Sequence, residues 1–364
     1  MSKLGKLNGY ASLVKMQTGK SKLRQFLEIV RLSCGKLRLG IDEYYELGVF
    51  DDTSFPYQEK VRCVGWRGSA LIDRLLNADH WRASANDKVL NYAILAHYGF
   101  PIPETIASFS PSGRTIAGER LLRTKEELFS YLCSALTLPV FVKPIHGTYG
   151  RGTFCLQSPL NDGESYLDAR GHVVSRDELL SVCFNEKFGG MLFQERLVQH
   201  PDVAVIVGST VSCVRVIVAV GDDRLPEVIL AFWKIGREKN ITDNFCMGES
   251  GNLLAWVDVG TGVVGRVITG LWPTGKECRN HPDTHAQLSG VRLPDWPSAL
   301  SLCLHAAELF PGLRLQHWDI AFSNDGPVLM ELNTEADLGV PQYLGGKAFV
   351  MEGIEALMKS RSRD

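Results

Sequence analysis

The sequence of 364 residues has little excess charge and no long hydrophobic run. Lys and Arg number 39 and Asp and Glu 41, so the formal net charge is −2, which gives no general attraction for nucleic acid. No stretch approaches the roughly 20 apolar residues of a membrane span. The first residues, MSKLGKLNGYASLVK, lack the apolar core of a secretion signal. With 45% hydrophobic and 22% charged residues, the composition predicts a soluble globular chain of two or three packed lobes.

Cysteine is present but never forms a paired motif. The nine cysteines are scattered, their number is odd, and no CxxC pair occurs. This pattern is typical of a reducing compartment and argues against a structural zinc site, so we expect a cytoplasmic protein. The GxxxxGK(S/T) loop and the glycine turn of dinucleotide-binding folds are also missing.

The segment LQHWDIAFSNDGPVLMELNTE, residues 315–335, predicts a β-hairpin that carries opposed acidic side chains. Its centre, Asn-Asp-Gly at 324–326, suits a three-residue turn with glycine last, where a left-handed backbone is wanted. Pairing outward from this turn sets Ala321 opposite Leu329, Asp319 opposite Glu331, and His317 opposite Asn333. Both faces of the hairpin are rich in apolar residues, so we expect it to be buried.

Two opposed carboxylates in a buried hairpin predict a metal site. Asp319 and Glu331 would lie about 5 Å apart and repel each other without a cation. Buried acids need a counter-charge or a metal, and Asn333 adds an amide oxygen beside them. We therefore predict a divalent cation at Asp319, Glu331 and Asn333. The alternative is a hairpin face that points to water with its charges solvated.

A second segment, VFVKPIHGTYGRGTFCL at residues 140–156, predicts two strands joined by a glycine loop. Glycines let backbone amides approach phosphate oxygens, so such a loop suits the covering of a polyphosphate. Lys143 interrupts an apolar strand and therefore needs an anion. The residues that we expect near the phosphates are Lys143, His146, Gly147, Gly150, Arg151 and Gly152. An ordinary hairpin that carries glycines is the alternative.

The remaining pattern predicts an α+β fold. Residues 1–80 are expected to be mainly helical, and blocks of helices and strands follow them. Strands are expected at 191–198 and 210–220, among others. The polar segment 236–252 is long enough without periodicity to be functional or mobile.

Basic residues are concentrated at the N-terminus. Residues 1–40 contain nine Lys or Arg against Glu28 alone. Apolar residues recur there at the spacing of a basic amphipathic helix, namely Leu23, Phe26, Leu27, Val30 and Leu32. We expect this apolar face to pack on the chain's own domain. Contact with an anionic membrane or an acidic partner is the alternative.

The order of these elements resembles the ATP-grasp superfamily. The resemblance rests on Lys88, FVKP with Lys143, the glycine loop, the strand ending in QERLV, and Asp319 followed by ELN at 331–333. The segments EYYELG, NDKVLNYAILAHYGFPIPE, TVSCVRVIV and ELNTEADLGVPQ resemble the sugar-transfer-associated subgroup, which is related to α-L-glutamate ligases. The resemblance implies two α+β lobes that grip ATP, preceded by a mainly helical N-terminal region. The expected units are residues 1–80, 81–195 and 196–364.

The same resemblance implies roles for individual residues. Lysines would contact the phosphates of ATP, a hinge would lie beside the adenine, and an acid would hold the ribose. The residues implied for these roles are Lys88, Lys143, Gln194, Glu195, Leu197, Val198 and Asp202. Asp319, Glu331 and Asn333 would hold one or two Mg²⁺ ions, with Mn²⁺ as a substitute. As alternatives, Lys88 is a surface lysine, and Glu195 and Asp202 are plain loop acids.

The activity that the resemblance implies is that of an ATP-dependent carboxylate–amine ligase. A substrate carboxylate would attack the γ-phosphate of ATP, and an amine would then attack the acyl phosphate to give an amide, ADP and phosphate. The expected partners are a small carboxylate and an amine, as an amino acid, a peptide or a sugar-linked compound, and no nucleic acid. A kinase that phosphorylates a hydroxyl or a sugar is one alternative, and a nucleotide-sensing protein without turnover is another. Nothing in the sequence predicts an oligomeric state.

A cation is needed in this chemistry to stabilise the oxyanion. Many ATP-grasp ligases keep an arginine two residues before the metal-binding aspartate, but His317 occupies that position here. Arg215 stands alone among the apolar residues of VSCVRVIVAV and is expected to take this role, unless it forms a structural ion pair. The expected catalytic set is Arg215, Lys143, His317 and Arg151.

Overall fold

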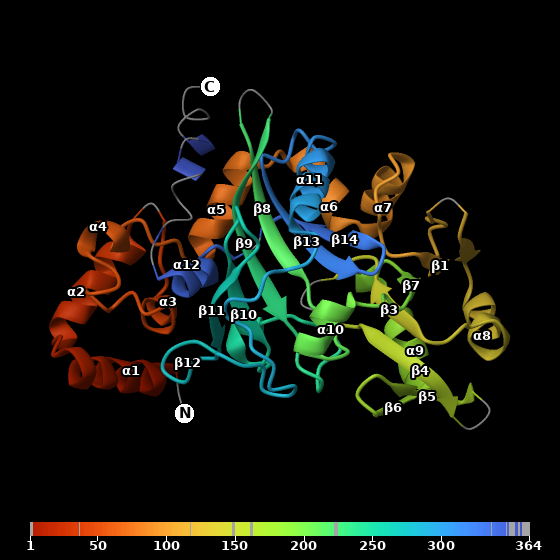
Figure 1. The fold of residues 1–364 in the computed structure, drawn as a ribbon, viewed down its shortest axis with the longest axis horizontal. Helices are drawn as coiled ribbons and strands as arrows, with labels where there is room; N and C mark the ends of the chain where they lie inside the picture. Colours follow the sequence, from red (N-terminus) through yellow and green to blue (C-terminus); the bar gives the residue numbers. More distant parts are fainter. Residues whose placement is uncertain are drawn as a thin grey trace.

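The computed structural model describes residues 3–35, 37–116, 118–147, 150–160, 163–221, 225–335, 337–346, 348, 354–355 and 357–358. Within these residues the chain forms an N-terminal helical region followed by two sheets with helices around them, which confirms the predicted α+β class (Figure 1). None of the helices in these ranges has the length and apolar content needed to cross a lipid bilayer.

The N-terminal region consists of short helices. Its elements are α1 (Lys3–Thr18), α2 (Lys22–Ser33), α3 (Ile41–Glu46), α4 (Tyr57–Lys60) and α5 (Trp66–Leu76). A 3₁₀ turn, η1 (Asp79–Trp81), and helices α6 (Ala83–Asn86) and α7 (Lys88–His97) lead into the first sheet. The side chain of Asp87 accepts a hydrogen bond from the backbone N–H of Leu90, so Asp87 caps α7 and places Lys88 in its first turn.

The first sheet contains seven strands among the described residues, in the order β2-β1-β7-β3-β4-β5-β6. The strands are β1 (Thr105–Phe109), β2 (Arg120–Leu122), β3 (Val140–Pro144), β4 (Phe154–Leu160), β5 (Ser165–Asp168), β6 (Val173–Ser175) and β7 (Met191–Glu195). Only the β1–β2 pair is parallel in this part of the structure. Helices α8 (Lys125–Ser134) and α9 (Arg176–Cys183) and the 3₁₀ turn η3 (Glu186–Phe188) complete this part.

The second sheet also contains seven described strands, in the order β12-β11-β10-β9-β8-β13-β14. They are β8 (Val214–Val220), β9 (Pro226–Ile235), β10 (Leu253–Val257), β11 (Val264–Thr269), β12 (Lys276–Glu277), β13 (Leu315–Ser323) and β14 (Gly326–Asn333). The helices with this sheet are α10 (Pro201–Val207), η4 (Cys246–Gly248), α11 (Trp296–Ala307) and α12 (Gly339–Gly345). The division into units at residues 80 and 195 stays a prediction.

Both faces of the second sheet are covered, which explains why its central strands are apolar throughout. In β8, Val216 and Val218 belong to the core shared with α11, whereas Ile217 and Ala219 belong to the core shared with the N-terminal region. A strand covered on both sides can carry a charged side chain only where that side chain meets a partner or a cavity. Arg215, at one end of β8, is such a residue.

The hairpin of β13 and β14 has the predicted register at its functional end and a different register at its turn. Asp319 pairs with Glu331 and His317 with Asn333, as predicted. However, Ser323 pairs with Gly326, so the turn has two residues and not three, and Ala321 faces Val328 and not Leu329. A β-bulge between Asp319 and Ile320 restores the register.

Helix α2 packs in the opposite sense to the prediction. Its buried residues are Gln25, Ile29 and Leu32, whereas Leu23, Phe26, Leu27 and Val30 are exposed. Of the predicted apolar face, only Leu32 packs on the domain. The prediction assumed that apolar residues decide which face is buried, but a polar network on the other face holds this helix.

Candidate active site

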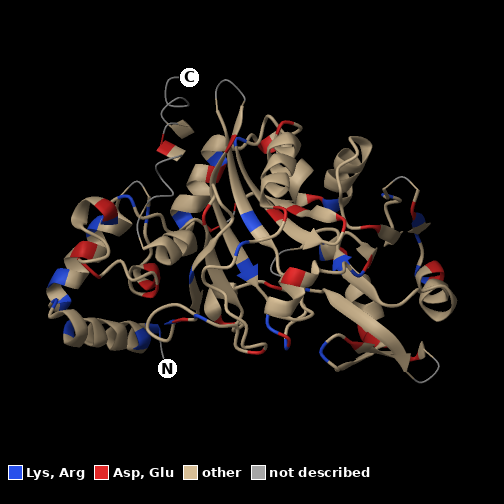
Figure 2. Cartoon of the chain, in the orientation of Figure 1, with Lys and Arg blue, Asp and Glu red and all other residues tan. Residues whose placement is uncertain are grey.

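A cavity of about 770 Å³ lies between the two sheets. Strands β3, β4 and β7 line it on one side, and β8, β9, β10, β13 and β14 line it on the other. Its volume lies within the range of pockets that hold small molecules and cofactors. Figure 2 shows charged residues of both signs near the middle of the molecule, around β8, β9 and β13.

Most of the residues predicted for the site line this cavity. They are Lys88, Lys143, His146, Gly147, Gly150, Arg151, Gln194, Glu195, Leu197, Arg215, Asp319, Glu331 and Asn333. These residues come from elements that are far apart in sequence, and the fold brings them together around one cavity.

Four predicted residues do not line the cavity. They are Gly152, Val198, Asp202 and His317. Val198 is mostly exposed, and the side chain of Asp202 is 80% exposed at the start of α10. For Asp202, the structure therefore favours the alternative of a plain loop acid.

Asp319 is held by two basic side chains. The Nε and Nη2 atoms of Arg215 donate to its two carboxylate oxygens at 2.8 and 2.7 Å, and Nζ of Lys234 lies 3.0 Å from Oδ2. Burial acts to raise the pKa of the Asp319 carboxyl, but the charges of Arg215 and Lys234 outweigh burial and hold the pKa far below its usual range. Arg215 thus forms the internal ion pair that the sequence left as an alternative, and it also lines the cavity.

Lys234 connects Asp319 to a second buried acid. Its Nζ atom lies 3.2 Å from Oδ1 of Asp243, whose Oδ2 accepts a hydrogen bond from the backbone N–H of Cys213 at 2.7 Å. Asp243 belongs to the polar segment 236–252, and residues 240–247 of that segment line the cavity. The segment is therefore part of the cavity wall.

Glu331, opposite Asp319, is paired with Lys88. Nζ of Lys88 lies 2.9 Å from Oε1 of Glu331 and also donates to the carbonyl oxygen of Gly147 at 3.2 Å. Burial acts to raise the pKa of the Glu331 carboxyl, but the charges of Lys88 and Lys143 keep that pKa below its usual value. Lys88 is buried, so the alternative of a surface lysine is wrong.

Lys143 is buried without an acid in direct contact among the described residues. Its Nζ atom donates to the hydroxyl oxygen of Tyr92 at 2.6 Å and lies 5.0 Å from the centre of that ring. Burial lowers the pKa of Lys143 to about 8. A cation that is buried on a cavity wall with only a phenol as partner can gain a stronger interaction from an anionic ligand.

The glycine loop approaches the segment 236–252 across the cavity. A Cβ atom on Gly150, where φ is +70°, would lie 3.0 Å from Oγ1 of Thr242 and 3.1 Å from Nδ2 of Asn244. A Cβ atom on Gly152 would lie 2.7 Å from the ring of Phe188, so packing accounts for that glycine. His146 hydrogen bonds weakly through Nδ1 to the carbonyl oxygen of Asn86 at 3.5 Å.

His317 is buried in the sheet and does not reach the cavity. Burial, with a smaller contribution from the charge of Arg215, lowers its pKa to about 3, and its Nδ1 atom has no hydrogen-bond partner among the described residues. The side chain is therefore neutral at pH 7 and cannot supply a positive charge to the site. Its position argues against the catalytic role expected from the sequence.

Sequence reasoning missed two members of the site. Tyr92 gave no signal beyond its place on a helix, and its contact with Lys143 arises only when α7 packs against β3. Asp243 lies in a segment without periodicity, and no pattern distinguishes it there from the many other polar residues. Lys234 carried a usable signal, because it follows an apolar run in β9.

The donor set fits a hard divalent cation. Asp319 and Glu331 are directly opposed on neighbouring strands, and Nδ2 of Asn333 lies 3.4 Å from Oδ2 of Asp319. Mg²⁺ is commonly bound by one or two carboxylates, with phosphate oxygens and water as the other ligands. Protein groups of three or more His, Cys, Asp or Glu that could bind a metal alone do not occur in the described ranges. The residues therefore suit a metal that enters with a phosphate ligand.

The two sheets that enclose this cavity agree with the two lobes that the resemblance to the ATP-grasp superfamily implies. The family model described as "Sugar-transfer associated ATP-grasp" matches residues 70–356. The chain belongs to the sugar-transfer-associated ATP-grasp family. No curated protein matches the sequence.

Solved structures of similar fold include several ligases and a carboxylase. ATP-grasp ligase PsnB complexed with minimal precursor is 17% identical over 79% of this chain and 63% of that chain, with a TM-score of 0.39. VanG D-Ala:D-Ser ligase from Enterococcus faecalis is 12% identical over 78% and 64%, with a TM-score of 0.42. Biotin carboxylase from Campylobacter jejuni is 10% identical over 80% and 51%, with a TM-score of 0.45. The match thus spans less than two thirds of each of these chains.

Proposed function

We propose that the protein is an ATP-dependent ligase that joins a carboxylate to an amine through an acyl phosphate and releases ADP and phosphate. The observation that carries the proposal is the opposition of Asp319 and Glu331 on a cavity wall that also presents Lys88 and Lys143. Two acids and two lysines in one cavity match the needs of a triphosphate bound together with a divalent cation.

In this proposal the lysines and the glycine loop bind the triphosphate. Lys143, whose hydrogen-bond partner among the described residues is the hydroxyl of Tyr92, gains a phosphate oxygen. The side chain of Lys88 lies between Glu331 and the glycine loop, so it can contact a phosphate there while its backbone stays in helix α7. Backbone amides around Gly147 and Gly150 would cover the phosphates, with His146 and Arg151 beside them.

Asp319, Glu331 and Asn333 would hold one or two Mg²⁺ ions, or Mn²⁺ in their place, which would neutralise phosphate charge. Arg215 and Lys234 keep the Asp319 carboxyl ionised and ready to act as a ligand. The backbone from Gln194 to Leu197 would lie beside the adenine, where β7 ends at the cavity.

Arg215 would have a second role at the reacting carbonyl. Its guanidinium lines the cavity next to the proposed metal site and can stabilise the oxyanion that forms when the amine attacks. No protein nucleophile is needed, because the substrate carboxylate itself would attack the γ-phosphate and be activated as the acyl phosphate. The substrates proposed are a small carboxylate and an amine, as an amino acid, a peptide or a sugar-linked compound.

All nine cysteines are free thiols, which supports a reducing, cytoplasmic location.

Hydroxylamine trapping tests this function. The full chain is incubated with ATP, Mg²⁺, hydroxylamine and a panel of carboxylates, and hydroxamate and ADP are measured. A ligase yields both products, and Asp319→Asn yields neither, whereas Asp202→Asn, on the exposed acid outside the cavity, matches the unmodified chain. ADP release with a phosphorylated hydroxyl or sugar and no hydroxamate would identify a kinase. ATP binding without ADP release for any pair of acid and amine would identify a nucleotide sensor.

A further inference from the structure

Helix α2 is held to the domain by Gln25 and Glu28 together with the apolar Ile29 and Leu32, whereas most of its large apolar residues face outward. Nε2 of Gln25 donates to the carbonyl oxygens of Ala11 and Lys20 at 3.1 and 2.9 Å, and its Oε1 accepts from the hydroxyl of Tyr45 at 3.1 Å. Glu28 accepts hydrogen bonds on the same side of the helix. Since these groups fix the inward face, the outward face is fixed as well.

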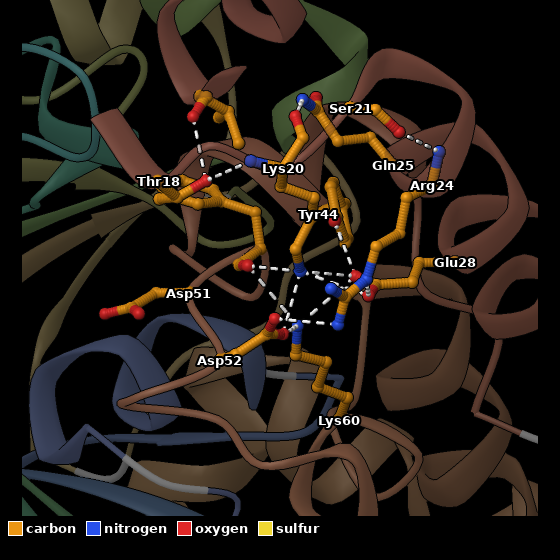
Figure 3. A network of polar contacts seen from close by, with 12 residues as sticks. Thr18, Lys20, Ser21, Arg24, Gln25, Glu28, Tyr44, Asp51, Asp52 and Lys60 are labelled. Atoms are coloured by element: carbon orange, nitrogen blue, oxygen red, sulfur yellow. Dashed lines mark hydrogen bonds and ion pairs between the residues drawn. The ribbon is translucent and has the colours of Figure 1, made fainter. Parts of the chain in front are cut away.

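Glu28 belongs to a network of charges that Figure 3 shows from close by. Its Oε2 atom lies 2.9 Å from Nζ of Lys20 and 3.2 Å from Nζ of Lys60, and it accepts from the hydroxyl of Tyr44 at 2.7 Å. Asp52 binds the same two lysines, at 2.8 and 2.5 Å. Both lysines are buried, so a shift of α2 that released Glu28 would leave two buried cations with Asp52 as their one remaining acid in this network.

The outward face of α2 is an apolar stripe. Leu23, Phe26, Leu27 and Val30 are 67%, 60%, 59% and 44% exposed, and their spacing of three and four residues places them side by side along the helix. Tyr57 and Val61, in and after α4, are also exposed. The guanidinium of Arg31 lies 4.8 Å from the centre of the Tyr57 ring, so α4 extends the apolar stripe.

Cations border the apolar stripe, and the acid of this helix is turned away from it. Lys22, Arg24 and Arg31 lie on α2 itself. Arg24 pairs with Asp52 at 3.0 Å, and Lys3 and Lys6 of α1 pair with Asp42 and Glu46, so the cations of α2 that are left for a partner are Lys22 and Arg31. Lys22 hydrogen bonds to the amide oxygen of Asn8 at 2.8 Å, and Arg31 lies over a ring, so neither forms an ion pair within the described part of the chain. Figure 2 shows basic residues on α1 and α2 at the left end of the molecule.

We propose that the apolar stripe of α2 docks on the surface of an anionic lipid membrane. A helix with exposed large apolar residues and flanking cations can bury its apolar side chains at the headgroup boundary while its cations meet lipid phosphates and carboxylates. A second copy of this chain is a poorer occupant, because it would bring the same cations together. Figure 1 shows α2 at the left end of the molecule, away from β3, β7 and β13, whose residues line the cavity, so docking leaves the cavity accessible. The proposal does not depend on the proposed ligase activity.

Vesicle sedimentation of the full chain tests this proposal. The protein is mixed with vesicles of phosphatidylcholine and phosphatidylserine, or of phosphatidylcholine alone, and the bound fraction is measured at low and high salt. We expect binding to the anionic vesicles that weakens as salt is added. The double variant Phe26→Ser, Leu27→Ser should bind roughly tenfold more weakly or worse, because two apolar side chains no longer enter the lipid. The double variant Lys22→Glu, Arg31→Glu should lose the preference for phosphatidylserine.

Phe129→Ser is the matched control, because Phe129 is also about half exposed but lies on α8. It should bind vesicles as the unmodified chain does. All the substituted side chains are exposed, so unchanged circular dichroism and melting temperature would show that the variants fold.

Equal binding of the chain to both kinds of vesicle, or binding to neither kind, would overturn the proposal. A concentration-dependent dimer that Phe26→Ser abolishes would assign the apolar stripe to a second copy. Retention on immobilised polyglutamate without vesicle binding would assign it to an acidic protein.

Discussion

Arg215 and Asp319 face each other on neighbouring strands, β8 and β13, and are joined by two hydrogen bonds of 2.8 and 2.7 Å. Asp319 is buried and Arg215 partly buried, and the buried Lys234 adds a third charge to the pair. The charges of Arg215 and Lys234 hold the pKa of the Asp319 carboxyl far below its usual range, so the carboxyl is ionised at neutral pH. The arrangement therefore keeps an ionised carboxylate at the cavity wall, where the metal ion of the proposed function would bind.

Replacing Asp319 should reduce stability as well as activity. In Asp319→Asn, the partly buried Arg215 would lose its counter-charge and Lys234 would keep Asp243 alone, which we expect to lower the free energy of unfolding by about 3 kcal/mol. Thermal and denaturant unfolding measure this change. The control is Asp202→Asn, since a surface change of this kind has an effect of about 0.5 kcal/mol or less. Equal stability of the two variants would contradict the account of the buried charge cluster.

Lys143 should make ATP binding depend on pH above about 8. Burial lowers the pKa of Lys143 to about 8 in the free protein, and a bound phosphate would raise this pKa. Below pH 8 the lysine is charged in both states and affinity is constant. Above pH 8 the free protein loses the proton and the complex keeps it, so affinity falls by up to about tenfold per pH unit.

Calorimetric titration with ATP over this pH range measures the effect, together with the proton taken up. Lys143→Arg is the control, because arginine stays charged throughout and should remove the pH dependence. A wild-type affinity that stays constant above pH 8, or that falls equally in Lys143→Arg, would show that Lys143 does not meet the phosphates.

Gly150 tests the contact between the glycine loop and the segment 236–252. In Gly150→Ala, the new Cβ atom would meet Thr242 and Asn244 at 3.0 and 3.1 Å, and the left-handed backbone would be strained. We expect the KM for ATP to rise about tenfold, which corresponds to a strain of 1–2 kcal/mol. Steady-state kinetics of ATP hydrolysis or ligation give this value.

Gly171→Ala separates the contact from the backbone strain. Gly171 has a similar φ of +79°, but its Cβ atom would meet nothing within 4 Å. It should share the cost in stability and leave the KM for ATP unchanged. If both variants raised the KM equally, the loop contact would not be responsible.

The sequence predicted the register at the functional end of the hairpin better than its turn. The pairing of Asp319 with Glu331 followed from an assumed three-residue turn, and the observed turn is one residue shorter. The β-bulge beside Asp319 compensates for this difference. A bulge depends on how the strand bends against its neighbours, and a single sequence does not reveal that. The burial of Lys143 was predictable, because a lysine within an apolar strand is buried together with its neighbours. Its contact with Tyr92 was not predictable, because that contact depends on how α7 packs.

Helix α2 shows why an apolar pattern alone can mislead. Spacing identified the right apolar residues in α2, yet the opposite face is buried. Glu28 and Gln25 decide the orientation, and their partners Lys60 and Tyr45 come from later segments of the chain. These contacts could not be predicted from the local sequence, because nothing in residues 22–33 indicates which later residues will supply them.

Magnesium-dependent binding of ATP tests the central claim most directly. Calorimetric titration with ATP, with and without Mg²⁺, compares the unmodified chain with Glu331→Gln and with Glu195→Gln, a change at the proposed adenine side of the cavity. We predict that Mg²⁺ strengthens binding to the unmodified chain and to Glu195→Gln, and that Glu331→Gln loses this enhancement by about tenfold or more. An enhancement by Mg²⁺ that is the same in Glu331→Gln as in the unmodified chain would contradict the assignment of the opposed carboxylates as metal ligands.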